Sequence, residues 1–130
     1  MKIKICNLKR CHPNTKRVLK KLTLYQCDES KMFEIITSNW DDRHVINIAI
    51  CYIEGKIVGW ASDWTGTKTN DNHWICCFVK PECRRKGVGT ALCNKLIERK
   101  KFAFGKAWDL ESEEFWESIK NKNKYFNVVR

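Results

Sequence analysis

One segment in the second half of the chain constrains the fold more than any other. An apolar run from His73 to Val79 is typical of a buried strand, and the amphipathic stretch from Val88 to Lys101 is typical of a helix. Between them lies a basic loop that contains Gly87 and Gly89. This order creates an anion site, because the loop and the first helical turn expose unpaired N–H groups at the positive end of the helix dipole. The segment therefore predicts an α/β domain that holds a phosphate group.

The spacing of the glycines excludes the two commonest phosphate loops. No G-x-x-x-x-G-K-[ST] run occurs, and Leu92 stands where a dinucleotide fingerprint needs its third glycine. The pattern that fits is V-x-P-x-x-R-x-x-G-x-G, which runs from Val79 to Gly89. With the apolar strand before it and the helix after it, this pattern resembles the acetyl-CoA loop of the GNAT-type N-acetyltransferases.

The resemblance implies a set of cofactor-binding residues. The pyrophosphate of acetyl-CoA should lie on the backbone of the loop, and the pantetheine arm should pair with the end of the preceding strand. One N–H group of that strand should face the thioester oxygen and stabilise its developing charge. The residues implied are Cys77, Phe78, Val79, Arg84, Arg85, Lys86, Gly87, Val88, Gly89 and Thr90.

Two residues are candidates for moving protons during acetyl transfer. His73 lies six residues before Val79, where several family members carry a glutamate base, and an imidazole can accept a proton near neutral pH. The family's next helix often carries a tyrosine near the CoA sulfur, but Trp116 stands at that position. Tyr125 is the substitute candidate for the acid, and protonation of the thiolate by water is the alternative.

Hydrophobic periodicity predicts the strands and helices of the whole chain. The expected order is β-α-α-β-β-β-α-β-α-β, a mixed and mostly antiparallel sheet flanked by helices, of the α/β (α+β) class. The expected strands are 2–8, 45–53, 56–64, 73–79, 102–108 and 125–129, and the expected helices are 13–21, a short one that begins at Ser30, 88–101 and 112–120. The resemblance implies that acetyl-CoA lies between the fourth and fifth strands.

Length and composition narrow the class of protein. At 130 residues, residues 1–130 should form a single domain. No apolar run approaches the roughly eighteen residues that a membrane helix needs, and the first residues lack a signal peptide, so we expect a cytoplasmic protein with no membrane contact. The eight cysteines include no C-x-x-C pair, and we expect reduced, mostly structural thiols and no metal site.

The positive charge is unevenly distributed and leaves a second function open. Residues 1–21 carry eight Lys or Arg and no acid, which indicates either a solvated face or a weak nucleic-acid contact through residues 2–21. The main hypothesis is an N-acetyltransferase in which a primary amine attacks acetyl-CoA directly in a ternary complex. The amine could belong to a small molecule, a protein or an aminoacyl-tRNA, and the enzyme could be a monomer or a homodimer. The alternative is a non-catalytic CoA-binding or nucleic-acid-binding module on the same fold.

Overall fold

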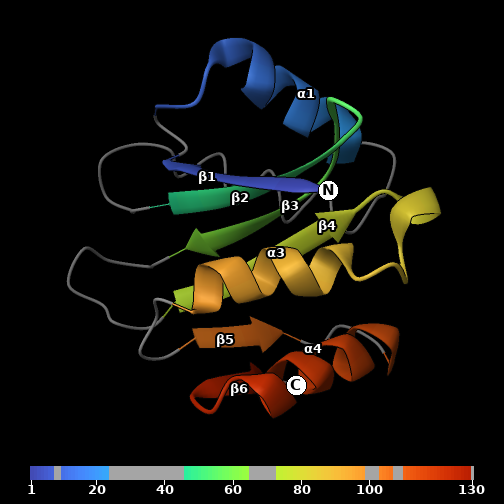
Figure 1. Cartoon of the computed structure of the whole chain (residues 1–130). Helices are drawn as coiled ribbons and strands as arrows, with labels where there is room; N and C mark the ends of the chain where they lie inside the picture. The colour runs from blue at the N-terminus through green and yellow to red at the C-terminus, as the bar shows by residue number, and fades with distance from the viewer. Residues whose placement is uncertain (8–9, 24–45, 65–72, 99–102, 107–109, 130) are drawn as a thin grey trace.

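The protein is built on one six-stranded sheet with strands in sequence order (Figure 1). The computed structural model describes residues 1–7, 10–23, 46–64, 73–98, 103–106 and 110–129. The first four strands pair antiparallel, and β4, β5 and β6 run parallel to one another. The strands are β1 (Lys2–Asn7), β2 (Ile46–Ile53), β3 (Lys56–Trp64), β4 (His73–Val79), β5 (Ala103–Lys106) and β6 (Phe126–Val129).

Helices cover both faces of this sheet. Helix α1 (Pro13–Thr23) packs on one face, while α3 (Val88–Ile97) packs on β2, β3 and β4 from the other face. Helix α4 (Leu110–Lys122) lies beside α3 and covers β5 and β6 (Figure 1). The mixed α/β fold and its mostly antiparallel sheet are thus confirmed. The short helix expected at Ser30 lies outside the described residues.

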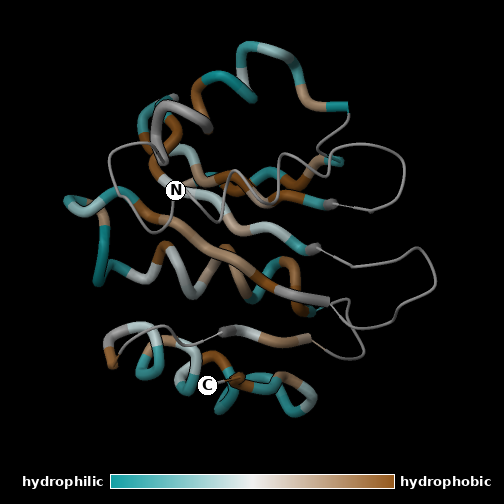
Figure 2. The backbone as a smooth tube through the Cα atoms, turned by 180° about the vertical axis from the view of Figure 1, so that it is seen from behind, coloured by the Kyte–Doolittle hydropathy of each residue, from teal (hydrophilic) through white to brown (hydrophobic). Residues whose placement is uncertain are grey.

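Strand alternation divides the buried side chains into two cores. The core under α3 and α4 contains Ala61, Ile75 and Leu92, whereas the core under α1 contains Leu19 and Trp60. Successive residues of a strand face opposite sides, so the continuously apolar strands in the middle of the sheet supply both cores. Figure 2 shows brown segments in these central strands, with β3 largely pale, and the hydrophilic loop after β4 in teal.

The β2–β3 hairpin lies at the same end of the sheet as the loop between β4 and α3, which we call the phosphate loop. Glu54 (φ +52°) and Gly55 (φ +77°) both adopt the left-handed conformation, as the central residues of a type I′ turn must. Beyond the turn, Cys51 pairs with Gly59 and Tyr52 with Ile57, so Val58 is an extra residue that forms a β-bulge. The carbonyl of Val58 accepts a hydrogen bond of 2.8 Å from the N–H of Lys80, which anchors the chain as it leaves β4.

The pairing between β4 and β5 is very short. Only His73–Ala103 and Trp74–Phe104 are in register, both at the beginning of the two strands. From Ile75 onward no strand pairing with β5 is described, and the sheet is open on this side of β4. The two halves of the sheet therefore join at one end and separate toward the phosphate loop, as the resemblance implied.

Helix α4 packs on the second half of the sheet through Trp116. Its indole stacks on Phe126 with ring centroids 5.6 Å apart and lies against the backbone of Gly105 in β5. A Cβ at Gly105 would fall 2.6 Å from Cε3 of Trp116 and 2.9 Å from Cζ of Phe126. Only a glycine lets the indole approach β5 this closely.

We predict that Gly105→Ala lowers the free energy of unfolding by about 1–3 kcal/mol, because the added methyl group overpacks a buried contact. Chemical denaturation of the variant and the wild type measures this loss. The same substitution in a Trp116→Leu background should cost much less, since the smaller side chain leaves room for the methyl group. An equal cost in both backgrounds would show that the indole is not what excludes a Cβ.

Candidate functional site

The loop between β4 and α3 exposes a row of backbone donors. A short 3-10 turn (Pro81–Cys83) follows β4, and Gly87 is the N-terminal cap of α3 with φ +83° and ψ 3°. The first helical hydrogen bond runs from the N–H of Ala91 to the carbonyl of Gly87, at 3.0 Å. The N–H groups of the first helical turn, at Val88, Gly89 and Thr90, therefore have no acceptor within the helix, and no side chain caps them. These donors form a site suited to a phosphate.

The two glycines of the loop act in different ways. Gly87 has a positive φ, and a Cβ there would meet nothing within 4 Å, so its role is conformational. Gly89 lies in the first turn of α3, and its missing Cβ points toward Cε2 of Phe115 at 3.2 Å and Cγ2 of Val79 at 3.6 Å. The missing Cβ of Gly89 therefore leaves room for α4 to approach α3.

Arg84 fastens the loop to the strand. Its Nε–H donates a hydrogen bond of 2.8 Å to the carbonyl of Val79, and its guanidinium lies 5.6 Å from the centroid of the Phe78 ring. Arg85 and Lys86 are exposed, and Arg85 has φ +61°, a costly conformation for a residue with a side chain. Arg84 therefore holds the loop in shape, whereas Arg85 and Lys86 present charge to solvent.

The open edge of β4 carries backbone donors of its own. The hydrogen bond from Lys80 to Val58 and the pairing of Phe78 with Trp60 direct the backbone polar groups of Phe78 toward β3. By the alternation of an antiparallel ladder, those of Cys77 and Val79 point to the other side, where the pairing with β5 has ended. Of the three strand residues expected to contact pantetheine, Cys77 and Val79 thus have the suitable direction.

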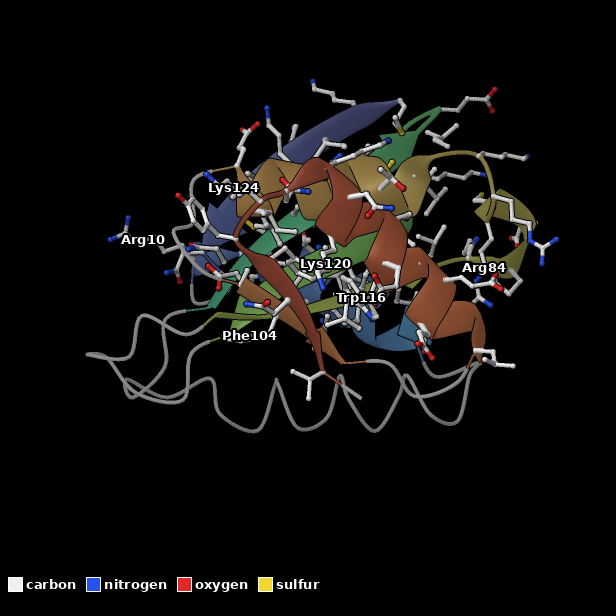
Figure 3. The ribbon with its side chains drawn as sticks, turned by 90° about the horizontal axis from the view of Figure 1, so that it is seen from below. Arg10, Arg84, Phe104, Trp116, Lys120 and Lys124 are labelled. Atoms are coloured by element: carbon white, nitrogen blue, oxygen red, sulfur yellow. The ribbon has the colours of Figure 1, made fainter. Side chains whose placement is uncertain are left out.

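The two candidate proton carriers, His73 and Tyr125, lie near the end of the sheet where β4 pairs with β5, which we call the closed end. The Cα of His73 pairs with that of Ala103, which in turn pairs with Phe126, directly after Tyr125. The position of the His73 imidazole is outside the described part of the structure. Tyr125 is 53% exposed, and Nζ of Lys124 lies 5.5 Å from the centroid of its ring. Figure 3 shows Lys124 and Arg84 toward opposite ends of the molecule, so Tyr125 is remote from the phosphate loop.

The thiols near the open edge hold their protons. Burial, together with the neighbouring thiols of Cys77 and Cys76, raises the pKa of Cys93 well above its ordinary value. Burial, with a smaller contribution from the nearby Cys77, raises the pKa of Cys76 to about 12. Because a thiolate is the reactive form, neither Cys76 nor Cys93 is suited to carry an acyl group. Within the described ranges, no three His, Cys, Asp or Glu residues converge on a metal-sized site.

Sequence reasoning placed Trp116 at the position of the family's tyrosine, but it did not identify Phe115 beside it on α4 as part of the site. Phe115 and Trp116 contact each other edge to face, with centroids 4.9 Å apart. Phe115 reaches Gly89 at the start of α3, and Trp116 reaches Gly105 on β5, so the pair links α3 to β5 through α4. Adjacent aromatic residues on an otherwise acidic helix were the available signal, but their partners are distant in sequence.

We predict that Arg84→Ala lowers the free energy of unfolding by about 1–2 kcal/mol, through loss of the bond to Val79 and of the contact with the Phe78 ring. Denaturant titration measures this change. Arg85→Ala is the matched control, since it removes the same charge from an exposed side chain without an anchoring role. Equal losses for the two variants would contradict the assignment of Arg84 as the anchor.

Comparisons with known proteins agree with this geometry. The model of the acetyltransferase (GNAT) family matches residues 13–118. The chain is 34% identical over 80 residues to an uncharacterized N-acetyltransferase of Methanocaldococcus jannaschii; this match covers 56% of the chain and 32% of the relative, so the chain spans about a third of its length.

Two solved structures show the same fold. The ribosomal-protein-S18-alanine N-acetyltransferase of Escherichia coli has a TM-score of 0.63 at 18% identity, covering 91% of this chain and 76% of that one. An aminoglycoside 6'-N-acetyltransferase complexed with coenzyme A has a TM-score of 0.53 at 18% identity, covering 73% and 53%. In the described ranges no helix is long and apolar enough to cross a membrane. By its matched domain and its fold, the chain belongs to the GNAT family of acetyltransferases.

Proposed function

We propose that the chain transfers an acetyl group from acetyl-CoA to a primary amine by direct attack in a ternary complex. The observation that carries this proposal is the opening between β4 and β5, which leads from the N–H row of α3 along the unpaired edge of β4. The coenzyme A bound to the aminoglycoside acetyltransferase of the same fold supports the choice of ligand. The acceptor amine is left open.

The residues present fit the shape and charge of acetyl-CoA. The N–H groups of Val88, Gly89 and Thr90 bind the pyrophosphate, and Arg85 and Lys86 supply positive charge beside it. The pantetheine amides pair with the backbone of Val79 and Cys77 as an added strand would. Cys77 carries the free N–H nearest to the closed end, so its N–H faces the thioester oxygen and stabilises the charge that develops there.

The transfer then needs one base and one proton donor. The amine nitrogen attacks the carbonyl carbon, a C–N bond forms and the C–S bond breaks. His73 accepts the proton that the amine loses, directly or through a water molecule. The thiolate that leaves takes its proton from water or from Tyr125, because Trp116 offers an indole N–H that is not an acid at useful pH.

The test of this mechanism is the substitution His73→Ala. If His73 is the base, kcat should fall by roughly 10²–10⁴-fold while the affinity for acetyl-CoA stays nearly unchanged. A base must be neutral to act, so wild-type activity should decline as pH falls through the range in which imidazoles protonate, and this decline should disappear in the variant. Calorimetry and pH–rate profiles measure both effects. An unaltered pH profile would assign the base to another group.

A second candidate function rests on the basic surface formed by β1 and α1. Lys2, Lys4 and Cys6 alternate on β1, and Cys6 packs in the core under α1, so Lys2 and Lys4 lie on the α1 side of the sheet. Nζ of Lys4 lies 5.7 Å from the centroid of the Tyr52 ring, and Arg17 of α1 is exposed. Basic side chains around a half-buried tyrosine favour contact with a nucleic acid, through phosphates and a stacked base.

Salt dependence separates the two functions. If this surface binds RNA, affinity should fall steeply between 50 and 200 mM salt, and the triple variant Lys2→Ala, Lys4→Ala, Arg17→Ala should flatten that slope by about 2–3. Filter binding with tRNA measures the slope, and calorimetry with acetyl-CoA is the control that should not change. Equal slopes for the variant and the wild type would show that this surface is a solvated face that does not bind RNA.

A further inference from the structure

The position of Trp116 bears on which acyl groups the enzyme accepts, an inference that rests on the proposed function. The β4–β5 pairing ends at Trp74 and Phe104. Extending this parallel register by one residue places Gly105 level with Ile75, at the closed end of the opening. Trp116 lies on Gly105 and is only 6% exposed, so its indole is buried on the α4 face of β5 at this level.

The acyl end of the ligand arrives at the same level. A pantetheine arm that starts at the phosphate loop pairs first with Val79 and then with Cys77. It therefore runs along β4 toward Ile75. At about 3.3 Å per residue, the distance from Val79 to Ile75 is about 13 Å. The acyl group, which lies beyond the sulfur, therefore ends between Ile75 and Gly105.

We propose that Trp116 is a specificity-determining residue that limits the acyl donor to acetyl-CoA and excludes longer acyl chains such as butyryl. The indole stacks on the Phe126 ring with centroids 5.6 Å apart, and it cannot move toward β5, where Gly105 already lies in contact. A rigid wall resists each added methylene through steric strain.

The experiment measures dissociation constants for CoA, acetyl-CoA and butyryl-CoA by calorimetry, which needs no knowledge of the acceptor. The wild type should bind acetyl-CoA at least tenfold more tightly than butyryl-CoA. Trp116→Phe keeps an aromatic ring on Phe126 but frees the volume of the outer, six-membered ring of the indole. It should improve butyryl-CoA binding by about tenfold to a hundredfold, since butyryl has two more methylenes than acetyl and each one that gains room contributes about tenfold, and leave CoA binding within threefold.

Phe115→Leu is the matched control, because Phe115 contacts Gly89 rather than Gly105. It should change the affinity for all three ligands together and leave their ratio unaltered. Thermal melts confirm that each variant is folded, and Trp116→Tyr, an intermediate change, replaces Trp116→Phe if the latter does not fold.

The outcomes distinguish this inference from the function on which it rests. A butyryl-to-acetyl ratio that stays the same in folded Trp116 variants that still bind CoA would overturn the specificity role and leave the acetyltransferase proposal standing. The same ratio change in Phe115→Leu would also overturn it, since the effect would not be local to Gly105. A wild-type protein that binds none of the three ligands would overturn both.

Discussion

The short pairing of β4 with β5 is the constraint on which the site depends. A parallel ladder normally continues along both strands, because each unpaired N–H that is buried costs free energy. Among the residues that the structure describes, the ladder has two pairs, and Cys77 and Val79 direct backbone donors to the far side of β4 from β3. A ligand with amide groups can complete the ladder, so the sheet is built with a place for one more strand-like partner. The phosphate loop at the open end determines the direction in which that partner enters.

Helix α4 holds the two halves of the sheet together where the strands do not. At its C-terminal end, Nδ2 of Asn123 donates a hydrogen bond of 3.0 Å to Oδ1 of Asn94 in α3. At its N-terminal half, the link to α3 is the contact of Phe115 with Gly89. The polar bond near the closed end is directional, whereas the aromatic contact near the open end depends on dispersion.

Structural features that depend on a local sequence pattern could be predicted, whereas features that depend on contacts between residues distant in sequence could not. The apolar strands, the Glu54–Gly55 turn and the strand–loop–helix segment each carry a local signal, and the structure confirms them. The packing role of Gly89 could not be predicted from the neighbouring sequence, because it depends on the Phe115 ring on another helix. Tyr125 was chosen by residue type alone, and its exposed place beside Lys124 depends on the turn after α4. The end of the β4–β5 ladder has no local signal at all.

Trp116 affects both the packing of α4 and the supply of a proton to the site. An indole on Gly105 gives α4 a firm contact with β5, but it places no hydroxyl at the closed end of the opening. The thiols behind the strand do not replace one, because burial raises the pKa of Cys93 and Cys76 and both keep their protons. An alkyl thiolate is a stable enough leaving group, with an ordinary thiol pKa of about 8.5, to depart before it is protonated. In the proposed mechanism, Trp116 therefore gives the site rigidity but no proton donor, and the proton comes from solvent after the acyl group has moved.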